Sequence, residues 1–216
     1  MGHVAPLIGS ACVAAGIFML VAAMNRRRRD ALAAYAVKHG LTFTEDCPNR
    51  VRLVTELIPA LNVGQNQSAR FELRGTRGDE QFSAFEYQYS TGGGRSQHYR
   101  SWTVLLWRAD NDNWPAFTLG PEGWWEKIKE RFGATDIDFP EDPEFSRLFQ
   151  LQGPDEKAVR GVFDAARCAF LKGRPGVHLA GNGPYLLSWT PVSFPSVKRL
   201  DTFFLDGDEI RQRFRT

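Results

Sequence analysis

Apolar residues are spread unevenly along the chain, and the longest uninterrupted apolar run lies near the N-terminus. From Val4 to Met24 no charged side chain occurs. A helix rises 1.5 Å per residue, so a helix of this length spans about 30 Å, the thickness of the hydrocarbon core of a bilayer. The pattern predicts one transmembrane helix that anchors the protein.

A run of four arginines, Arg26, Arg27, Arg28 and Arg29, follows the apolar segment directly. A cleaved secretory signal, the main competing interpretation, carries its positive charges before a shorter apolar core. Positively charged flanks stay on the cytoplasmic side, and they attract anionic lipid. The sequence therefore predicts a single-pass protein of the cell membrane, with the N-terminus outside and the soluble domain in the cytoplasm. Residues 1–29 form the anchor with its basic flank, and residues 30–216 form the soluble domain.

Alternating apolar and polar positions predict an antiparallel sheet in the centre of the chain. Arg70 to Gly75, Gln81 to Tyr89 and Tyr99 to Arg108 are rich in aromatic or β-branched residues and are separated by glycine-containing turns. These three strands are expected to form a meander. Val177 to Ala180 and Tyr185 to Trp189 flank a Gly-Asn-Gly turn and predict a C-terminal hairpin.

Other segments predict helices and short strands around this sheet. The fold class is α+β, with helices packed on an antiparallel sheet. Asp206-Gly207-Asp208 is expected to end the last helix, because such a sequence is typical of a turn. The expected elements are a helix reaching about His39 before Gly40, a strand at Leu41 to Thr44, a helix at Asn49 to Leu57, strand–turn–helix units beginning at Phe117 and Phe149, and a closing helix containing Val197, Leu200 and Phe204.

Composition supports a folded domain and narrows its partners. The aromatic share is 12% and the net charge is +2, so the chain can fill a core but carries no broadly basic surface for nucleic acid. Cys12, Cys47 and Cys168 cannot all pair with one another, which argues against a disulfide framework. The expected partners are the lipid bilayer and a protein, with no nucleic acid.

Candidate chemistry is sparse, and each candidate has a structural alternative. The acidic stretch Asp136 to Glu144 could bind a cation, but Pro140 and Pro143 favour a solvated loop. Gly92 to Arg95 could cradle a phosphate, but it precedes a strand and favours a hairpin loop. The histidines lack zinc-site spacing. Trp124 or Trp125 is a candidate partner contact, because an exposed aromatic side chain is costly unless it is used. No catalytic residue, metal ligand or cofactor is identified.

A resemblance to a family of uncharacterised bacterial proteins is carried by several short segments. They are Phe85-Glu86-Tyr87, Gly92-Gly93-Gly94, Trp114 to Leu119 with Pro121-Glu122, Asp136 to Phe139, Pro143 to Ser146, and Gly153 to Glu156. The resemblance covers roughly residues 30 to 205. It implies a membrane-associated bacterial protein with an N-terminal membrane segment and a soluble α+β domain, and it implies no activity or functional residue.

These observations favour a non-enzymatic, membrane-tethered interaction or scaffold module. The alternative is an enzyme, such as a small-molecule hydrolase, whose site is assembled from distant residues. A pocket in which titratable groups converge would favour the enzyme, and a flat aromatic patch would favour a partner surface.

Overall fold

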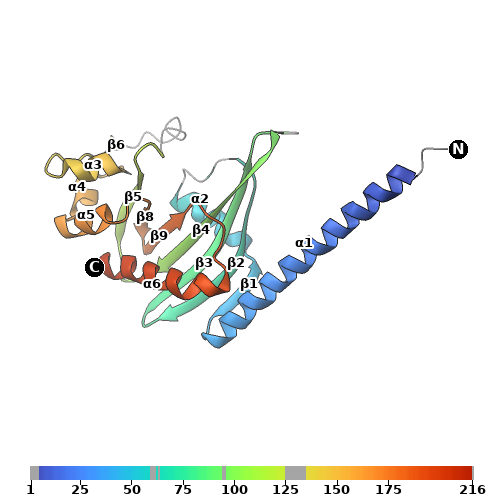
Figure 1. Ribbon diagram of the computed structural model, residues 1–216. Coiled ribbons are helices and arrows are strands. Elements are labelled where there is room, and N and C mark those ends of the chain that lie inside the picture. Colours follow the sequence, from blue (N-terminus) through green and yellow to red (C-terminus); the bar gives the residue numbers. More distant parts are fainter. Residues whose placement is uncertain (1–4, 59–61, 63, 94–95, 125–134, 216) are drawn as a thin grey trace.

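The computed structural model describes residues 5–58, 62, 64–93, 96–124 and 135–215, and within the first helix it describes side chains from Gly16 onward. The fold is α+β, as predicted, and is built on one antiparallel sheet with the order β1-β2-β3-β4-β9-β8-β5-β7-β6 (Figure 1). The strands are β1 (Thr42–Asp46), β2 (Gln65–Arg77), β3 (Glu80–Thr91), β4 (His98–Arg108), β5 (Trp114–Pro121), β6 (Thr135–Asp136), β7 (Phe149–Gly153), β8 (His178–Gly183) and β9 (Tyr185–Thr190). The helices are α1 (Ala5–Lys38), α2 (Pro48–Leu57), α3 (Pro143–Leu148), α4 (Glu156–Val162), α5 (Ala165–Lys172) and α6 (Val197–Arg213).

The predicted meander and C-terminal hairpin are both present. Strands β2, β3 and β4 are neighbours in the sheet, and β8 pairs with β9. Strand β9 also pairs with β4, so the hairpin extends the meander within the same sheet. The two strands that follow the meander in sequence, β5 and β7, add on the far side of β8.

Both faces of the sheet are buried, and each face has its own hydrophobic core. The first core lies under α1 and α6 and includes Leu73, Leu105 and Leu200. The second lies under α2 and includes Val54, Tyr87 and Trp189. Neighbouring positions of a strand point to opposite faces of the sheet. Since both faces are covered, β3 and β4 have buried residues at successive positions.

Strand β2 changes face at a bulge. Ala69 belongs to the core under α2, whereas Phe71, two residues later, belongs to the core under α1 and α6. In a regular strand these two positions share a face. The pairing register shifts between Arg70 and Leu73, and Phe71 has a φ of 59°, a left-handed conformation that a bulky side chain rarely adopts. The bulge therefore supplies β2 with core residues for both sides of the sheet.

The predicted end of the last helix at Asp206-Gly207-Asp208 is wrong. Helix α6 continues to Arg213, and Gly207 is buried within it. A side chain at Gly207 would overlap the side chain of Leu105, so the glycine allows the helix to approach the sheet closely. Ile210 is buried on the next turn. Tertiary packing here outweighs the local tendency of this sequence to turn.

The predicted transmembrane helix is also contradicted. Among the described residues, no helix is long and apolar enough to cross a membrane. Within the part of α1 whose side chains are described, the apolar run extends only from Gly16 to Met24, or about 14 Å of helix against a hydrocarbon core of about 30 Å. The apolar residues before Gly16 lie outside the described side chains. The predicted boundary after residue 29 falls inside α1, which continues to Lys38.

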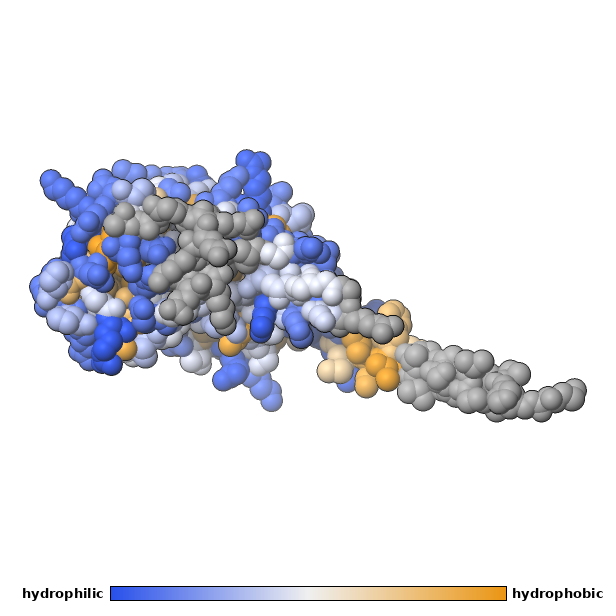
Figure 2. Space-filling model, turned by 90° about the horizontal axis from the view of Figure 1, so that it is seen from above, coloured by the Kyte–Doolittle hydropathy of each residue, from blue (hydrophilic) through white to orange (hydrophobic). Residues whose placement is uncertain are grey.

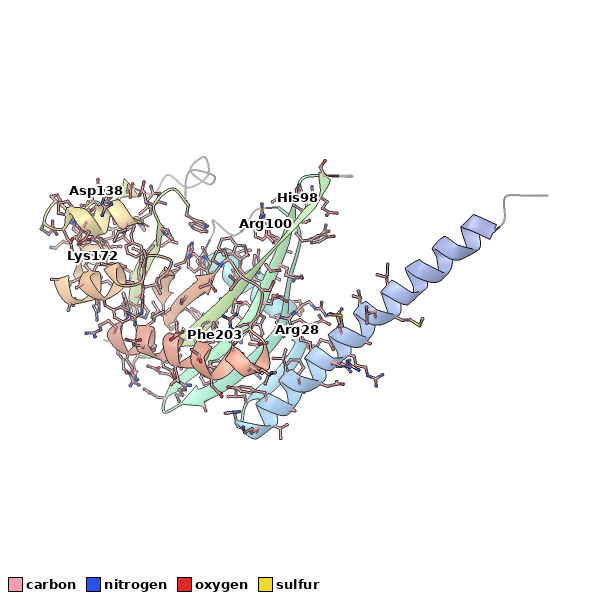
Figure 3. The ribbon with its side chains drawn as sticks, in the orientation of Figure 1. Arg28, His98, Arg100, Asp138, Lys172 and Phe203 are labelled. Carbon is pink, nitrogen blue, oxygen red and sulfur yellow. The ribbon has the colours of Figure 1, made fainter. Side chains whose placement is uncertain are left out.

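Helix α1 is attached to the sheet by Arg28, which is labelled in Figure 3. Its Nη2 donates a hydrogen bond to the Phe194 carbonyl oxygen at 3.0 Å and lies 3.8 Å from Glu86 Oε1. Glu86 is only 2% exposed, and its Oε1 also accepts a hydrogen bond from the Phe194 amide. The Arg28 guanidinium lies 4.6 Å from the centre of the Phe71 ring, at the bulge. One arginine thus links α1, β2, β3 and the segment before α6.

We expect Arg28→Ala to lower the free energy of unfolding by about 1–3 kcal/mol, because it leaves the buried Glu86 carboxylate without its cation. Urea denaturation of the full chain measures the change. Arg27→Ala is the matched control, since Arg27 is exposed on the same helix and the substitution should change stability little. Equal effects of the two substitutions would contradict the anchoring role of Arg28.

Candidate functional site

The most unusual surface of the described structure lies on α1, where the helix leaves the domain (Figure 1). Six large apolar side chains on this part of the helix are between 49% and 75% exposed. They are Ile17, Phe18, Met19, Leu20, Val21 and Met24. In Figure 2 they form the orange area at the base of the projecting helix, next to a mostly hydrophilic domain. We call residues 17–24 the apolar segment.

The apolar segment is exposed around the whole helix. Consecutive helical positions are about 100° apart, so the five successive residues Ile17 to Val21 cover more than one full turn. None of the five is buried against the domain. A surface helix normally has one apolar and one polar face, and a helix that is apolar all round is normally covered. An exposed apolar patch of this kind marks a site of interaction.

The predicted basic run divides into two parts in the structure. Arg26 and Arg27 are exposed and directly follow the apolar segment. Arg28 holds α1 to the sheet, and Arg29 pairs with Asp30 at 3.2 Å and with Glu45 at 3.6 Å. The sequence predicts one charged flank of four arginines, whereas in the structure Arg28 and Arg29 make ion pairs within the fold. Only Arg26 and Arg27 remain as a positive border of the apolar segment.

A groove of about 340 Å³ lies between the last turns of α1, the β2–β3 turn and α6. Tyr35 donates a hydrogen bond to Asp201 Oδ1 at 2.7 Å and stacks on His39, with ring centres 4.1 Å apart. His39 Nε2 lies 4.0 Å from the same carboxylate oxygen. Burial and the Asp201 carboxylate both raise the pKa of Tyr35, so its hydroxyl remains a donor.

Arg77 and Asp208 form another pair in the groove and contact each other directly. Their opposite charges neutralise each other. The Asp201 side chain is 68% exposed, so the His39–Asp201 pair stands in solvent. Tyr35 and His39 hold the end of α1 against α6, and Arg77 holds the end of β2 against the same helix. The sequence gives no local signal for these contacts, because the paired residues lie far apart in the chain.

A second charged cluster is buried at the C-terminal end of α6. Arg211 Nη2 lies 2.6 Å from Glu80 Oε1 and 2.7 Å from Asp112 Oδ2, and the Arg211 side chain is 5% exposed. The indole nitrogen of Trp114 donates to the same Asp112 oxygen at 3.0 Å. The cluster joins α6 to the start of β3 and to the β4–β5 connection. Removing one partner of such a pair is costly, because the charge of the other partner is then buried without its counter-charge.

The sheet face under α2 contains a buried histidine among three tryptophans. The centre of the His178 ring lies 4.8 Å from that of Trp124, 5.2 Å from Trp189 and 6.0 Å from Trp102. His178 is 3% exposed, and neither ring nitrogen makes a hydrogen bond of normal geometry with a described residue. Burial therefore lowers the pKa of His178 to about 4. Trp124 is part of this cluster, and Trp125 lies outside the described residues.

The predicted acidic stretch is held by basic side chains. Asp142 caps α3 by accepting a hydrogen bond from the Phe145 amide, and it pairs with Lys172 at 2.9 Å. The hydrogen bond from Lys172 lowers the pKa of Asp142. Arg160 lies 3.6 Å from Glu141. Among the described residues, no group of three or more His, Cys, Asp or Glu side chains could hold a metal ion.

The remaining candidates from the sequence are the glycine loop after β3 and the cysteines. Gly92 has a φ of 80° at the end of β3, while Gly94 and Arg95 lie outside the described residues. Cys47 and Cys168 are buried free thiols. Burial raises the pKa of Cys47 to about 12 and that of Cys168 to about 11, so both stay protonated and unreactive at neutral pH.

Comparison with known proteins identifies a similar fold. No protein-family model matches the chain, and no characterised protein matches it in sequence. The crystal structure of the mycobacterial trehalose monomycolate transport factor A, TtfA, superposes with a TM-score of 0.57. The match has 15% sequence identity and covers 88% of this chain and 93% of the other. At this identity the similarity shows the fold alone.

The buried His178 predicts a specific loss of stability in acid. The unfolded chain takes up a proton at its ordinary pKa of about 6.5, whereas the folded protein resists protonation down to about pH 4. The contribution of the neutral, buried His178 to the free energy of unfolding is therefore fully present above about pH 6.5. It is lost as the pH drops toward 4, and the loss is about 2 kcal/mol at pH 5. His178→Phe, which keeps a ring among the tryptophans, should remove this part of the pH dependence.

Chemical denaturation at pH 7 and pH 5 measures the effect as the difference between the wild-type protein and the variant. The carboxylates also gain protons in acid, but they are the same in both proteins, so their contribution cancels in this difference. His98→Gln is the control, because His98 is exposed at the tip of the β3–β4 hairpin (Figure 3) and should leave the pH dependence unchanged. If His178→Phe loses as much stability in acid as the wild type, His178 is not the responsible group.

Proposed function

We propose that this protein is a non-enzymatic interaction module and that the apolar segment of α1 is the surface by which it binds a partner protein. The observation that carries the proposal is the exposure of residues 17–24 around the whole helix, at a point where the helix has left the domain. Covering these side chains is favourable by roughly 25 cal/mol for each Å² of apolar surface removed from water.

The charges beside the segment indicate the chemistry of the partner. Arg26 and Arg27 are exposed at its C-terminal end, whereas Arg28 and Arg29 pair with carboxylates. A complementary surface is an apolar groove or helix bordered by carboxylates. Apolar contact then supplies affinity, and the arginines fix the direction in which the helix lies on its partner.

The remaining surface supports a binding role over a catalytic one. In the α1–α6 groove the ionisable groups are paired with one another, and the two described cysteines are buried with raised pKa values.

The alternative function is an enzyme with a site assembled from distant residues. Its one supporting observation is the convergence of Tyr35, His39 and Asp201 in the α1–α6 groove. The solvent exposure of Asp201 counts against it, because an acid–base pair gains strength from a site that excludes water. His39→Gln should leave partner binding unchanged under the proposed function.

The proposal predicts a crosslinking pattern in cells that express the full chain. A photo-crosslinking residue in place of Phe18 should give one discrete adduct with a second protein. Leu20→Gln in the same chain should reduce that adduct by about tenfold or more, because it puts a polar amide into the apolar contact. Since Leu20 is exposed and touches no core, the substitution should leave the melting temperature unchanged.

The matched control places the crosslinking residue at Leu205, which is 67% exposed on α6. It should give no adduct with the same protein. An adduct equal in mass to two copies of this chain would assign the segment to self-association, and adducts with lipid alone would assign it to a lipid surface. Either result contradicts the proposed partner protein.

A further inference from the structure

A second pocket, of about 330 Å³, lies beneath α6 on the sheet. Its floor is formed by β4 and β9, one wall by α6, and the other wall by the connection between α5 and β8. None of its lining residues belongs to the α1–α6 groove or to the apolar segment. A molecule bound in this pocket would therefore occupy a different surface from the proposed partner protein.

The floor of this pocket carries hydroxyl groups where a core would normally be apolar. Thr103 pairs with Thr190 and Leu105 pairs with Ser188, so all four side chains share the sheet face on which α6 lies. Thr103 is 1% exposed and Ser188 is 8% exposed. The Thr103 hydroxyl donates to the Val192 carbonyl oxygen at 3.0 Å, which leaves Ser188 and Thr190 to face the pocket.

The walls are mostly apolar. Phe203 and Ile210 of α6, together with Leu105 and Val177, surround the hydroxyls. Phe203 is labelled in Figure 3, on the part of α6 that crosses the sheet. Small-molecule sites typically combine an apolar lining with a few placed polar groups, and they begin at about 300 Å³. The size and lining of this pocket both meet that description.

The charges at the rim do not favour an anion. Arg174 lines the pocket, but its Nη2 lies 2.6 Å from Glu209 and its guanidinium stacks 4.0 Å from the centre of the Phe170 ring. Asp206, the other charged residue of the lining, is exposed. A carboxylate or phosphate entering here would meet Asp206 and an arginine that is already paired.

We infer that this pocket binds a small uncharged molecule with an apolar body and one hydroxyl group, of the class of a medium-chain alcohol. The apolar body lies against Leu105, Phe203 and Ile210. The hydroxyl exchanges hydrogen bonds with Ser188 and Thr190, which can each donate and accept. Those hydrogen bonds explain why a buried face of two central strands keeps hydroxyl side chains.

The test is a titration of the full chain with 1-octanol, followed by the amide resonances of residues 188, 190, 203 and 210. We expect saturable shifts at these positions. Thr190→Val removes one hydroxyl with little change of shape and should weaken binding several-fold, and Ser188→Leu fills the pocket and should abolish it. Leu205→Gln, on the exposed side of α6, is the control and should bind as the wild type does.

Octanoate and octylamine, which match the chain length but carry a charge, should bind at least tenfold more weakly than 1-octanol. Shifts that grow linearly without saturation show simple partitioning into apolar surface and overturn the inference. Equal binding by either charged compound overturns the assignment to an uncharged ligand. If Ser188→Leu fails to fold, Thr190→Val decides, and an unchanged affinity in that variant rejects the hydroxyl contacts.

Discussion

The pairing of β3 with β4 is the constraint on which the rest of the structure depends. The two strands stay in register from Gln81 opposite Arg108 to Thr91 opposite His98, without a bulge. Side chains of both strands are buried on both faces, so the helices that cover this part of the sheet, α2 on one face and α1 and α6 on the other, must fit a surface fixed by this ladder. Phe85 and Val104 face α2 as a pair, while Ala84 and Leu105 face α6 and α1. A shift of one residue would exchange the two cores.

This central ladder could be predicted from sequence because its signal is local. Phe85, Tyr87 and Tyr89 alternate with smaller or polar residues, and the glycine-containing turns on either side set the strand ends. The hairpin of β8 and β9, the strand after Gly40 and the helix before it were predicted for the same reason. Gly40 has a φ of 66°, the left-handed conformation that ends many helices.

What sequence reasoning missed depends on contacts between distant residues. The Asp-Gly-Asp run in α6 has the composition of a turn, but Gly207 meets Leu105 from another part of the chain. The bulge at Phe71 and the buried cluster of Arg211, Glu80 and Asp112 have no local signal, because each exists only when several elements are assembled. The transmembrane prediction failed differently. It rested on the length of the uncharged run from Val4 to Met24, but among the described residues no helix is long and apolar enough to cross a membrane.

The division of that arginine run connects the fold to the proposed function. A helix is stiff over a few turns, so fixing α1 at Arg28 also fixes the direction in which residues 17–24 project, about 16 Å from Arg28 to Ile17. The anchor includes Glu86, a buried carboxylate in the middle of β3, and Phe71, at the strained position of β2. A strained backbone or a buried charge persists only where the surrounding structure holds it in place. Here Phe71 and Glu86 both contact Arg28 and so support the base of the projecting helix. The central ladder therefore does more than fill two cores. Through Glu86 and Arg28, together with Leu32 and Ala36 of α1 in the core, it determines where the apolar segment is presented, which a flexible linker at residues 26–29 could not do.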